Sequence, residues 1–259
     1  LQTAIDAWDT NSTYATSQYG DINTWNVSAI TNMYELFYKK KNITTLDLSG
    51  WDTSNVESMT YMFYGCTSLT TLNLNNWNTS SLQDMLSMFS GCTDLTSVSM
   101  QQTNSDNGVW NNLPPELMQL FLNCEKLTTI SGIENWDTSS VDNMQQVFDG
   151  CKELTTLNIS NWDVGNVETF FRMFARCTKL SNLNLSSWST SPDSIFGMFY
   201  QCEALTSLNL SGFDTSGVSR NEMAHVFNGC TSLSTVTGLS SWCVEDTAFS
   251  ISPPMNFAT

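Results

Sequence analysis

A unit of about 26 residues recurs along most of this chain, and this repetition limits the possible folds more than any other feature. A phenylalanine marks each unit, at Phe37, Phe63, Phe89, Phe121, Phe148, Phe174, Phe199 and Phe227. A second marker, nearly always tryptophan, lies at Trp25, Trp51, Trp77, Trp136, Trp162, Trp188, Phe213 and Trp242. Three residues after each phenylalanine stands Lys40 in the first unit and then Cys66, Cys92, Cys124, Cys151, Cys177, Cys202 and Cys230. So short a unit cannot bury its own apolar side chains, so neighbouring units must stack.

Each unit combines two local patterns. Leu72, Asn73 and Leu74 alternate apolar and polar, which is typical of a strand buried on one face. Val56, Met59 and Phe63 are three or four residues apart, which predicts a short helix or a helical turn. A period in the twenties with an L-x-x-L-x-L strand is the signature of a leucine-rich repeat. The sequence therefore predicts an α/β leucine-rich-repeat solenoid: a single parallel sheet of about eight short strands, with short helices or helical turns on the opposite face.

The repeat also predicts how the chain is organised. We expect one solenoid over residues 1–259, with an N-terminal cap at 1–24, repeats at 25–242 and a C-terminal cap at 243–259, because the ends of a solenoid need polar covers. The fourth unit is longer than the others, and Asn104–Gly108 is expected to form a loop there.

Composition excludes several classes of protein. The net charge is −16, from 9 Lys+Arg and 25 Asp+Glu, so the chain lacks the cations that nucleic-acid binding requires. The 12% aromatic residues exclude a disordered acidic tail, and no apolar run reaches the roughly 20 residues of a membrane-spanning helix. Ser, Thr and Asn make up 92 of the 259 residues, a polarity that suits contacts by short hydrogen bonds outside the cell.

The segment from Leu46 to Cys66, LDLSGWDTSNVESMTYMFYGC, closely resembles the repeat of BspA-like leucine-rich-repeat surface proteins of bacteria. The resemblance covers roughly residues 25–242. It implies a secreted or surface-attached protein, often one that takes part in adhesion to host tissue or other microbes. The family brings with it no enzymatic activity and no fixed ligand-binding residues.

The cysteines raise two alternatives. Eight cysteines in an extracellular chain suggest a disulfide framework. Seven of them share one repeat position, however, so we expect buried free thiols whose parallel side chains suit disulfide geometry poorly. The state of Cys243, outside this column, is left open. A line of Cys and Met residues also does not converge as the ligands of a soft metal must.

Acidic residues that follow the tryptophan marker raise the possibility of calcium. Their positions are Asp52, Asp137, Asp163 and Asp214. Asn78 and Ser189 interrupt the series, and an Asx-turn explains Asp, Asn and Ser equally well. We therefore expect neither a metal nor a cofactor.

Catalysis has little support. His225 is the single histidine, and no nucleophile stands beside it at a fixed spacing. The middle outward position of the expected strands contains one acid, Asp47, whereas glycoside hydrolysis needs a converging pair. We expect no catalytic residues and no enzyme.

Two surfaces are candidates for ligand binding. The first is the strand face, the outward side chains of the expected sheet, which are short, polar and nearly uncharged. Its candidate residues are Thr45, Asp47, Thr71, Asn73, Ser97, Ser99, Thr156, Asn158, Asn182, Asn184, Ser207 and Asn209. A solvated parallel sheet would favour the same residue types without any ligand.

The second surface, the Tyr/Lys patch, combines aromatic and basic residues near the N-terminal end: Tyr34, Tyr38, Lys39, Lys40, Lys41, Tyr61 and Tyr64. Aromatic side chains with cations are unusual on so acidic a chain and would suit a glycan or an acidic partner.

From these patterns we expect a non-catalytic, extracellular recognition domain of a bacterial surface protein. Its partners would be host or microbial surface proteins or glycans, and the fragment would not insert into a membrane. The alternative is a structural stalk that projects another module from the cell surface.

Overall fold

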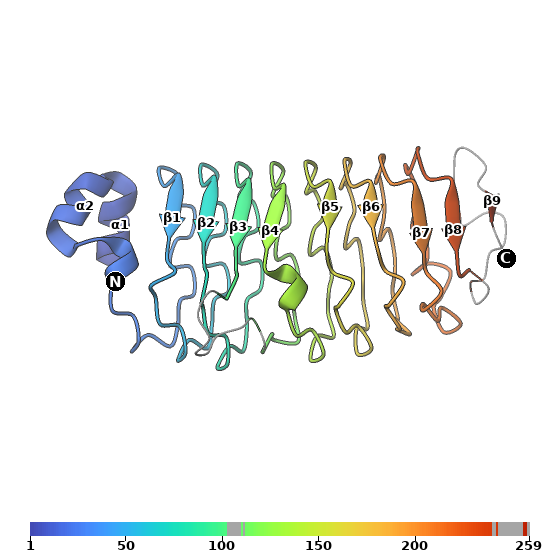
Figure 1. Ribbon diagram of the computed structural model, residues 1–259, viewed down its shortest axis with the longest axis horizontal. Helices are drawn as coiled ribbons and strands as arrows, with labels where there is room; N and C mark the ends of the chain where they lie inside the picture. Colours follow the sequence, from blue (N-terminus) through green and yellow to red (C-terminus); the bar gives the residue numbers. More distant parts are fainter. Residues whose placement is uncertain (103–109, 111, 240–241, 243–255, 258–259) are drawn as a thin grey trace.

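The computed structural model describes residues 1–102, 110, 112–239, 242 and the backbone of 256–257. Three helical segments come first: α1 (Gln2–Thr10), α2 (Ser12–Tyr19) and the 3-10 turn η1 (Ile22–Thr24). The remaining elements are β1 (Thr45–Asp47), β2 (Thr71–Asn73), β3 (Ser97–Ser99), β4 (Thr129–Ser131), the 3-10 turn η2 (Ile133–Asn135), β5 (Thr156–Leu157), β6 (Asn182–Leu183), β7 (Ser207–Asn209), β8 (Thr235–Thr237) and β9 (Asn256–Phe257). Figure 1 shows β1 to β8 side by side in chain order, with α1 and α2 at one end. The expected loop at 104–108, Cys243 and all of the expected C-terminal cap except β9 lie outside the described residues.

The strands pair in parallel, and each strand pairs with the strand of the next repeat. Leu46 lies opposite Leu72 and Leu72 opposite Val98, so the same repeat position lines up from strand to strand. The ladder forms three consecutive sheets, β1–β4, β5–β6 and β7–β9. Backbone bonds continue across both breaks, from Glu153 N–H to Glu125 O and from Ala204 N–H to Thr178 O, each 3.1 Å. This arrangement confirms the predicted parallel solenoid, with the row of strands divided into three segments.

Two aromatic columns run through the core. The rings of Phe63 and Phe89 lie 5.7 Å apart with an interplanar angle of 6°, and Trp51 and Trp77 stack in the same way at 6.4 Å. These four side chains are at most 2% exposed. Regular repetition therefore brings most of these rings onto their counterparts in the next turn, as the markers in the sequence predict. Between Trp77 and Trp136 the stacked ring is that of Trp110, which the sequence markers do not include.

The side opposite the strands consists of turns; within the described residues it contains no α-helix. We call the surface formed by residues 33–40, 59–66 and their counterparts the turn face. Cys66 N–H bonds three residues back to Phe63 O at 3.1 Å, but Phe63 N–H bonds to Met88 O of the next repeat at 2.9 Å. An α-helix would require every N–H to bond four residues back. Of the two expected forms, helix or helical turn, the chain adopts turns because alternate N–H groups join neighbouring repeats.

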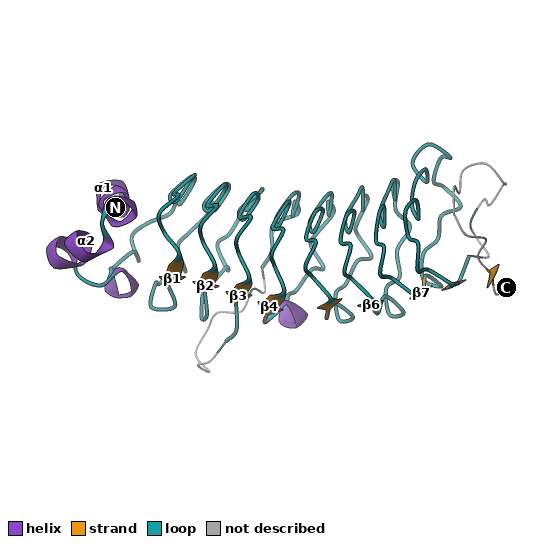
Figure 2. Cartoon of the chain, turned by 90° about the horizontal axis from the view of Figure 1, so that it is seen from above, coloured by secondary structure: helices purple, strands orange, loops and turns teal. Residues whose placement is uncertain are grey.

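The stack is nearly straight, with the strands along one side and the turns along the other (Figure 2). Leucine-rich repeats with helices would bend, because a helix is about 10 Å wide and strands lie about 4.8 Å apart. Here both sides are joined by backbone hydrogen bonds, such as Leu48 N–H to Asn73 O and Gly65 N–H to Ser90 O. Equal spacing on the two sides removes the cause of curvature.

The two N-terminal helices pack against the first repeat. Trp8 of α1 meets Trp25 edge to face, with ring centroids 6.2 Å apart. Asp6 of α1 accepts from Lys40 Nζ at 2.7 Å, and Asp9 accepts from the backbone N–H of Asn42 at 2.9 Å. Lys40 occupies the cysteine position of its repeat, so at this end the column position carries an ion pair to the helix instead of a thiol.

Candidate functional site

The strand face has the predicted alternation of side chains. Leu46, Leu72 and Val98 are buried, while the residues on either side of each are exposed or half-buried. All twelve predicted strand-face residues, Thr45, Asp47, Thr71, Asn73, Ser97, Ser99, Thr156, Asn158, Asn182, Asn184, Ser207 and Asn209, are exposed or half-buried. The first six line a shallow groove of about 440 Å³ over β1 to β4, together with Asn75 and Ser131. The other six belong to the neighbouring repeats.

Hydrogen bonds separate these residues into two rows. The second row, Asp47, Asn73, Asn158, Asn184 and Asn209, uses its side-chain oxygens to close the turn after each strand. Asp47 Oδ1, for example, accepts from the N–H of Ser49 at 3.0 Å and from its hydroxyl at 2.7 Å. Ser99 likewise donates to Asn75 Oδ1 at 2.7 Å. These oxygens stabilise the solenoid itself and are already occupied.

The first row differs. Its predicted members are Thr45, Thr71, Ser97, Thr156, Asn182 and Ser207. Within the described part of the chain, their side chains make no hydrogen bond. Because successive strands stand about 4.8 Å apart, this row presents hydroxyl and amide groups at a regular spacing along the molecule. We call it the free row.

The Tyr/Lys patch is a packed cluster on the turn face. Tyr38 and Tyr64 stack at 5.3 Å, and Tyr61 meets both Tyr34 and Tyr64 edge to face at 6.0 and 5.5 Å. Lys39 Nζ lies 4.6 Å from the centre of the Tyr38 ring. The structure therefore brings the four tyrosines and Lys39 together in one cluster.

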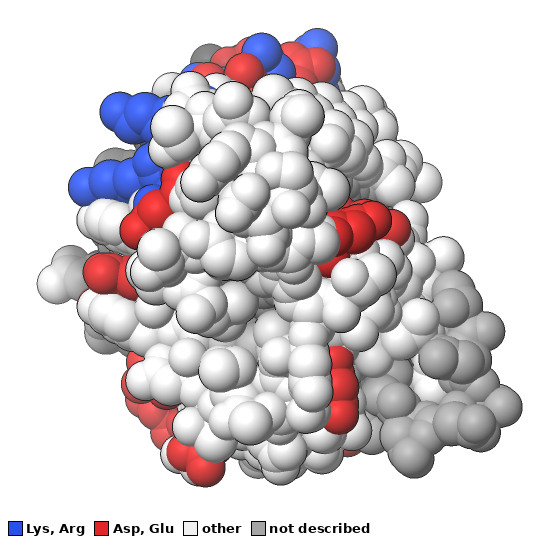
Figure 3. Space-filling model, turned by 90° about the vertical axis from the view of Figure 1, so that its left-hand side faces the viewer, with Lys and Arg blue, Asp and Glu red and all other residues white. Residues whose placement is uncertain are grey.

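Lys40, a predicted member of the same patch, is only partly exposed. Its side chain is 19% exposed, and its Nζ donates a hydrogen bond to Asp6. This bond lowers the pKa of the Asp6 carboxyl. Lys41 is exposed. Viewed from the N-terminal end, Lys and Arg atoms gather near the rim, and most of the visible surface is uncharged (Figure 3).

The acids that follow the tryptophan marker form Asx-turns. Asp52 Oδ1 accepts from Ser54 Oγ at 2.7 Å and from Ser54 N–H at 3.1 Å, and these two bonds lower the pKa of Asp52. Asn78, which interrupts the acidic series, closes the same turn by accepting from Ser80 N–H at 2.9 Å. An amide thus performs the same task as the carboxylate. Within the described residues, no three His, Cys, Asp or Glu side chains gather as metal ligands would.

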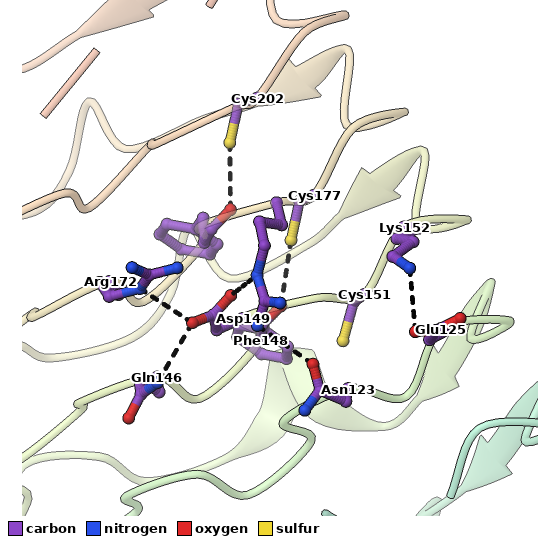
Figure 4. Close-up of polar contacts among 12 residues, drawn as sticks. Asn123, Glu125, Gln146, Phe148, Asp149, Cys151, Lys152, Arg172, Cys177 and Cys202 are labelled. Atoms are coloured by element: carbon purple, nitrogen blue, oxygen red, sulfur yellow. Dashed lines mark hydrogen bonds and ion pairs between the residues drawn. The ribbon is translucent and has the colours of Figure 1, made fainter. Parts of the chain in front are cut away.

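In each repeat, the column cysteine follows the phenylalanine marker and precedes the strand in the chain. All seven cysteines in the described residues are free thiols, and all are buried. Each S–H donates to the carbonyl of the phenylalanine one repeat earlier, as Cys177 does to Phe148 at 3.1 Å and Cys202 to Phe174 at 3.1 Å (Figure 4). Burial raises the pKa of Cys92, Cys124, Cys151, Cys177 and Cys202, and that of Cys230 to about 12. A protonated, enclosed thiol is a poor nucleophile, which fits a structural role.

One polar cluster was not predicted from the sequence. Asp149, fully buried on the turn side, accepts from Arg172 Nε at 3.1 Å and from Arg176 Nε at 2.7 Å (Figure 4). Gln146 Nε2 adds a third bond at 3.2 Å, and Arg176 Nη2 reaches Asn123 Oδ1 at 3.1 Å. Gln146 and Arg172 share one repeat position, and Asn123 and Arg176 share another, but the residue types differ from repeat to repeat, so the periodic pattern does not mark them. Two arginines within one unit of an acidic chain are the only hint that the sequence alone offers.

Among the described residues, none of the helices has the length and apolar character needed to cross a bilayer.

Residues 10–112 and 115–242 match the family model described as "Mycoplasma protein of unknown function, DUF285". A comparison with curated proteins found no match.

Several solved structures of repeat proteins are similar at low identity. A leucine-rich-repeat protein of Leptospira interrogans is 16% identical, with a TM-score of 0.37 over 76% of this chain and 43% of its own. A leucine-rich-repeat protein of Bacteroides ovatus is 18% identical, with a TM-score of 0.27 over 79% and 57%. The functional domain of InlJ from Listeria monocytogenes, described as including a cysteine ladder, is 14% identical, with a TM-score of 0.31 over 82% and 44%. The chain thus spans about half the length of these proteins. None of their descriptions mentions BspA, so the BspA-like assignment stays a prediction.

Proposed function

The chain belongs to the DUF285 family, and we propose that this member is a non-catalytic extracellular recognition domain that binds a protein or glycan of a host or microbial surface through its strand face. The observation that supports this proposal is the free row. The solenoid itself uses the side-chain oxygens of the second row, but within the described parts of the chain it leaves the hydroxyl and amide groups of the first row unbonded. A ligand can take up these groups without breaking any bond of the fold.

The position and lining of the groove support the same proposal. It lies over the first four strands, where Thr71 and Ser97 face outward from adjacent strands, and Asp47 is the single acid among its lining residues. Few ion pairs can form there, so we expect binding by many short hydrogen bonds with weak dependence on salt.

Arginine substitutions in the free row test the proposal. Thr71→Arg with Ser97→Arg places two long cations in the groove without removing a hydrogen bond of the fold. We expect binding of the purified domain to whole cells, matrix proteins or a glycan array to fall at least about tenfold. The matched control is Thr13→Arg with Gln18→Arg on α2, which adds the same charge at two exposed positions.

The Tyr/Lys patch is the competing surface. Lys39→Glu with Lys41→Glu tests it and leaves the Lys40–Asp6 ion pair in place. If the glutamate pair abolishes binding while the arginine pair in the groove does not, the strand face is not the recognition surface. A ligand at this patch should also dissociate steeply as salt rises.

The alternative function, a structural stalk, is favoured by the straight stack (Figure 2). A spacer requires length and stiffness but no free hydrogen-bonding groups. The absence of saturable binding by the unmodified domain to every cell, matrix and glycan preparation would support the stalk and contradict the recognition proposal.

A further inference from the structure

The cluster around Asp149 contains more positive charge than its own acid neutralises. Asp149 is fully buried and accepts one bond from each of the two arginines, through their Nε atoms (Figure 4). The side chains of Arg172 and Arg176 are 27% and 35% exposed, so the guanidinium groups lie between the buried acid and the solvent. With two cations and one anion, the cluster carries a net charge of about +1 on a molecule of net charge −16.

The geometry leaves specific donors unused. Arg172 uses only Nε in its bond to Asp149, and within the described residues nothing accepts from its two Nη groups. Arg176 uses Nε and Nη2, which leaves Nη1. A guanidinium held through Nε keeps its Nη groups in a fixed plane, and a planar fork of this kind binds oxyanions with two hydrogen bonds.

One aromatic ring packs against the guanidinium group of Arg172. The guanidinium carbon lies 5.3 Å from the centre of the half-buried Tyr200 ring. This cation–π contact, together with the bond to Asp149, restricts the movement of the guanidinium group.

From this arrangement we propose that Arg172 and Arg176 form an oxyanion-binding site on the turn face, which takes a carboxylate or sulfate group of a ligand. Asp149 is a positioning residue, since it fixes both guanidinium groups and is itself out of reach of the ligand. The site lies on the side of the solenoid opposite the free row, so it does not rest on the function proposed for the strand face.

Side-chain NMR on the unmodified domain tests the site directly. The Nε–Hε signals of Arg172 and Arg176 are followed while sodium glucuronate, a carboxylate, or sodium sulfate is added at constant ionic strength, with sodium chloride as the balance. We expect both signals to shift and to saturate in the millimolar range. Saturation with either oxyanion supports the site, and the ratio of the two affinities shows which group it prefers. Shifts that do not saturate, or that sodium chloride alone reproduces, would overturn the proposal.

Two substitutions complete the experiment. Arg172→Gln keeps an amide near Asp149 but removes the fork, and we expect the oxyanion affinity reported by the Arg176 signal to fall at least about tenfold. Lys126→Gln is the control: it makes the same change in net charge at a side chain that is 60% exposed and paired with Asp94. Equal affinity in both variants would contradict the proposal. Because the unmodified domain provides its own readout, a variant that fails to fold does not leave the question open.

Discussion

At the scale of single residues, the cysteine column shows how a reactive side chain is made inert. Cys151 and Cys202 are completely buried, and desolvation raises the pKa of each thiol. Each S–H also has an acceptor, a phenylalanine carbonyl of the preceding repeat, at 3.3 Å for Cys151 and 3.1 Å for Cys202. The column therefore behaves as part of the core and gives each of these carbonyls a second donor, beside the backbone N–H of the cysteine three residues later in the chain.

We predict that the folded domain resists alkylation and loses stability in alkali. An exposed thiol titrates near pH 8.5, whereas the folded pKa of Cys230 is raised to about 12. Between these values the unfolded chain has released protons that the folded chain still holds, so rising pH favours unfolding. Urea midpoints should be lower at pH 10.5 than at pH 8.5.

Mass spectrometry tests the predicted resistance to alkylation. Iodoacetamide at pH 8 should leave the seven described cysteines unmodified in the folded protein and label all seven after denaturation. Three or more intact disulfides in the denatured sample would contradict the free-thiol column.

At the scale of elements, the sequence pattern predicted which side chains are buried but not which hydrogen bonds the backbone makes. The spacings of Leu72, Trp77 and Phe63 correctly predicted which side chains are buried, because burial follows the period of the repeat. The spacing of Met59, Phe63 and Cys66 also suits a helix, yet this segment forms turns. Side-chain periodicity reports the buried face and contains no information about whether an N–H bonds within its own repeat or to the next one.

The candidate sites show the same limit. The exposed rows of the strand face follow from alternation and were predictable. The division into an occupied and a free row depends on local turns such as that of Asn73 with Asn75. The Lys40–Asp6 pair joins residues 34 positions apart, and the Asp149 cluster joins four repeats. Contacts between non-repeated residues require the fold before they can be seen.

We predict that the Trp column is a main source of cohesion between repeats. Trp162 is 3% exposed, stacks on Trp136 and Trp188 at 5.8 and 6.5 Å, and donates from Nε1 to Ile133 O at 3.0 Å. Trp162→Ala should lower the free energy of unfolding by about 3–5 kcal/mol, measured by urea denaturation.

The control is Trp25→Ala, at the tryptophan position of the first repeat. Trp25 is only partly buried and stands in contact with Trp8, so its loss should cost less and affect mainly the terminal helices. Equal costs at the two positions would show that stacking between tryptophans is not the dominant contribution.

At the scale of the whole molecule, the stack is a linear array in which each turn contacts its neighbours. Strand pairing always joins consecutive strands, from β1–β2 through β8–β9 within the three sheets. The length of the molecule should then be proportional to the number of repeats, because each added turn needs only the turn before it.

We predict that one repeat can be removed without loss of the fold. Deleting residues 51–76 joins Gly50 to Trp77 and keeps every column in register. The domain should still unfold cooperatively, and its maximum dimension in small-angle scattering should shrink by roughly 4.8 Å. A deletion of thirteen residues, half a repeat, is the control and should abolish folding, because it places polar positions against the core. If both deletions behave alike, the register between turns is not what specifies the structure.

The direction of the backbone hydrogen bonds has a mechanical consequence. The bonds that join neighbouring turns, such as Phe63 N–H to Met88 O, run along the long axis of the molecule (Figure 1). A force applied between the N-terminal helices and β8 would therefore act on the hydrogen bonds of one turn at a time, as in unzipping. Each turn of about 26 residues would then release roughly 90 Å of extended chain. Under tension such a domain yields stepwise, and the turns that have not yet opened stay intact.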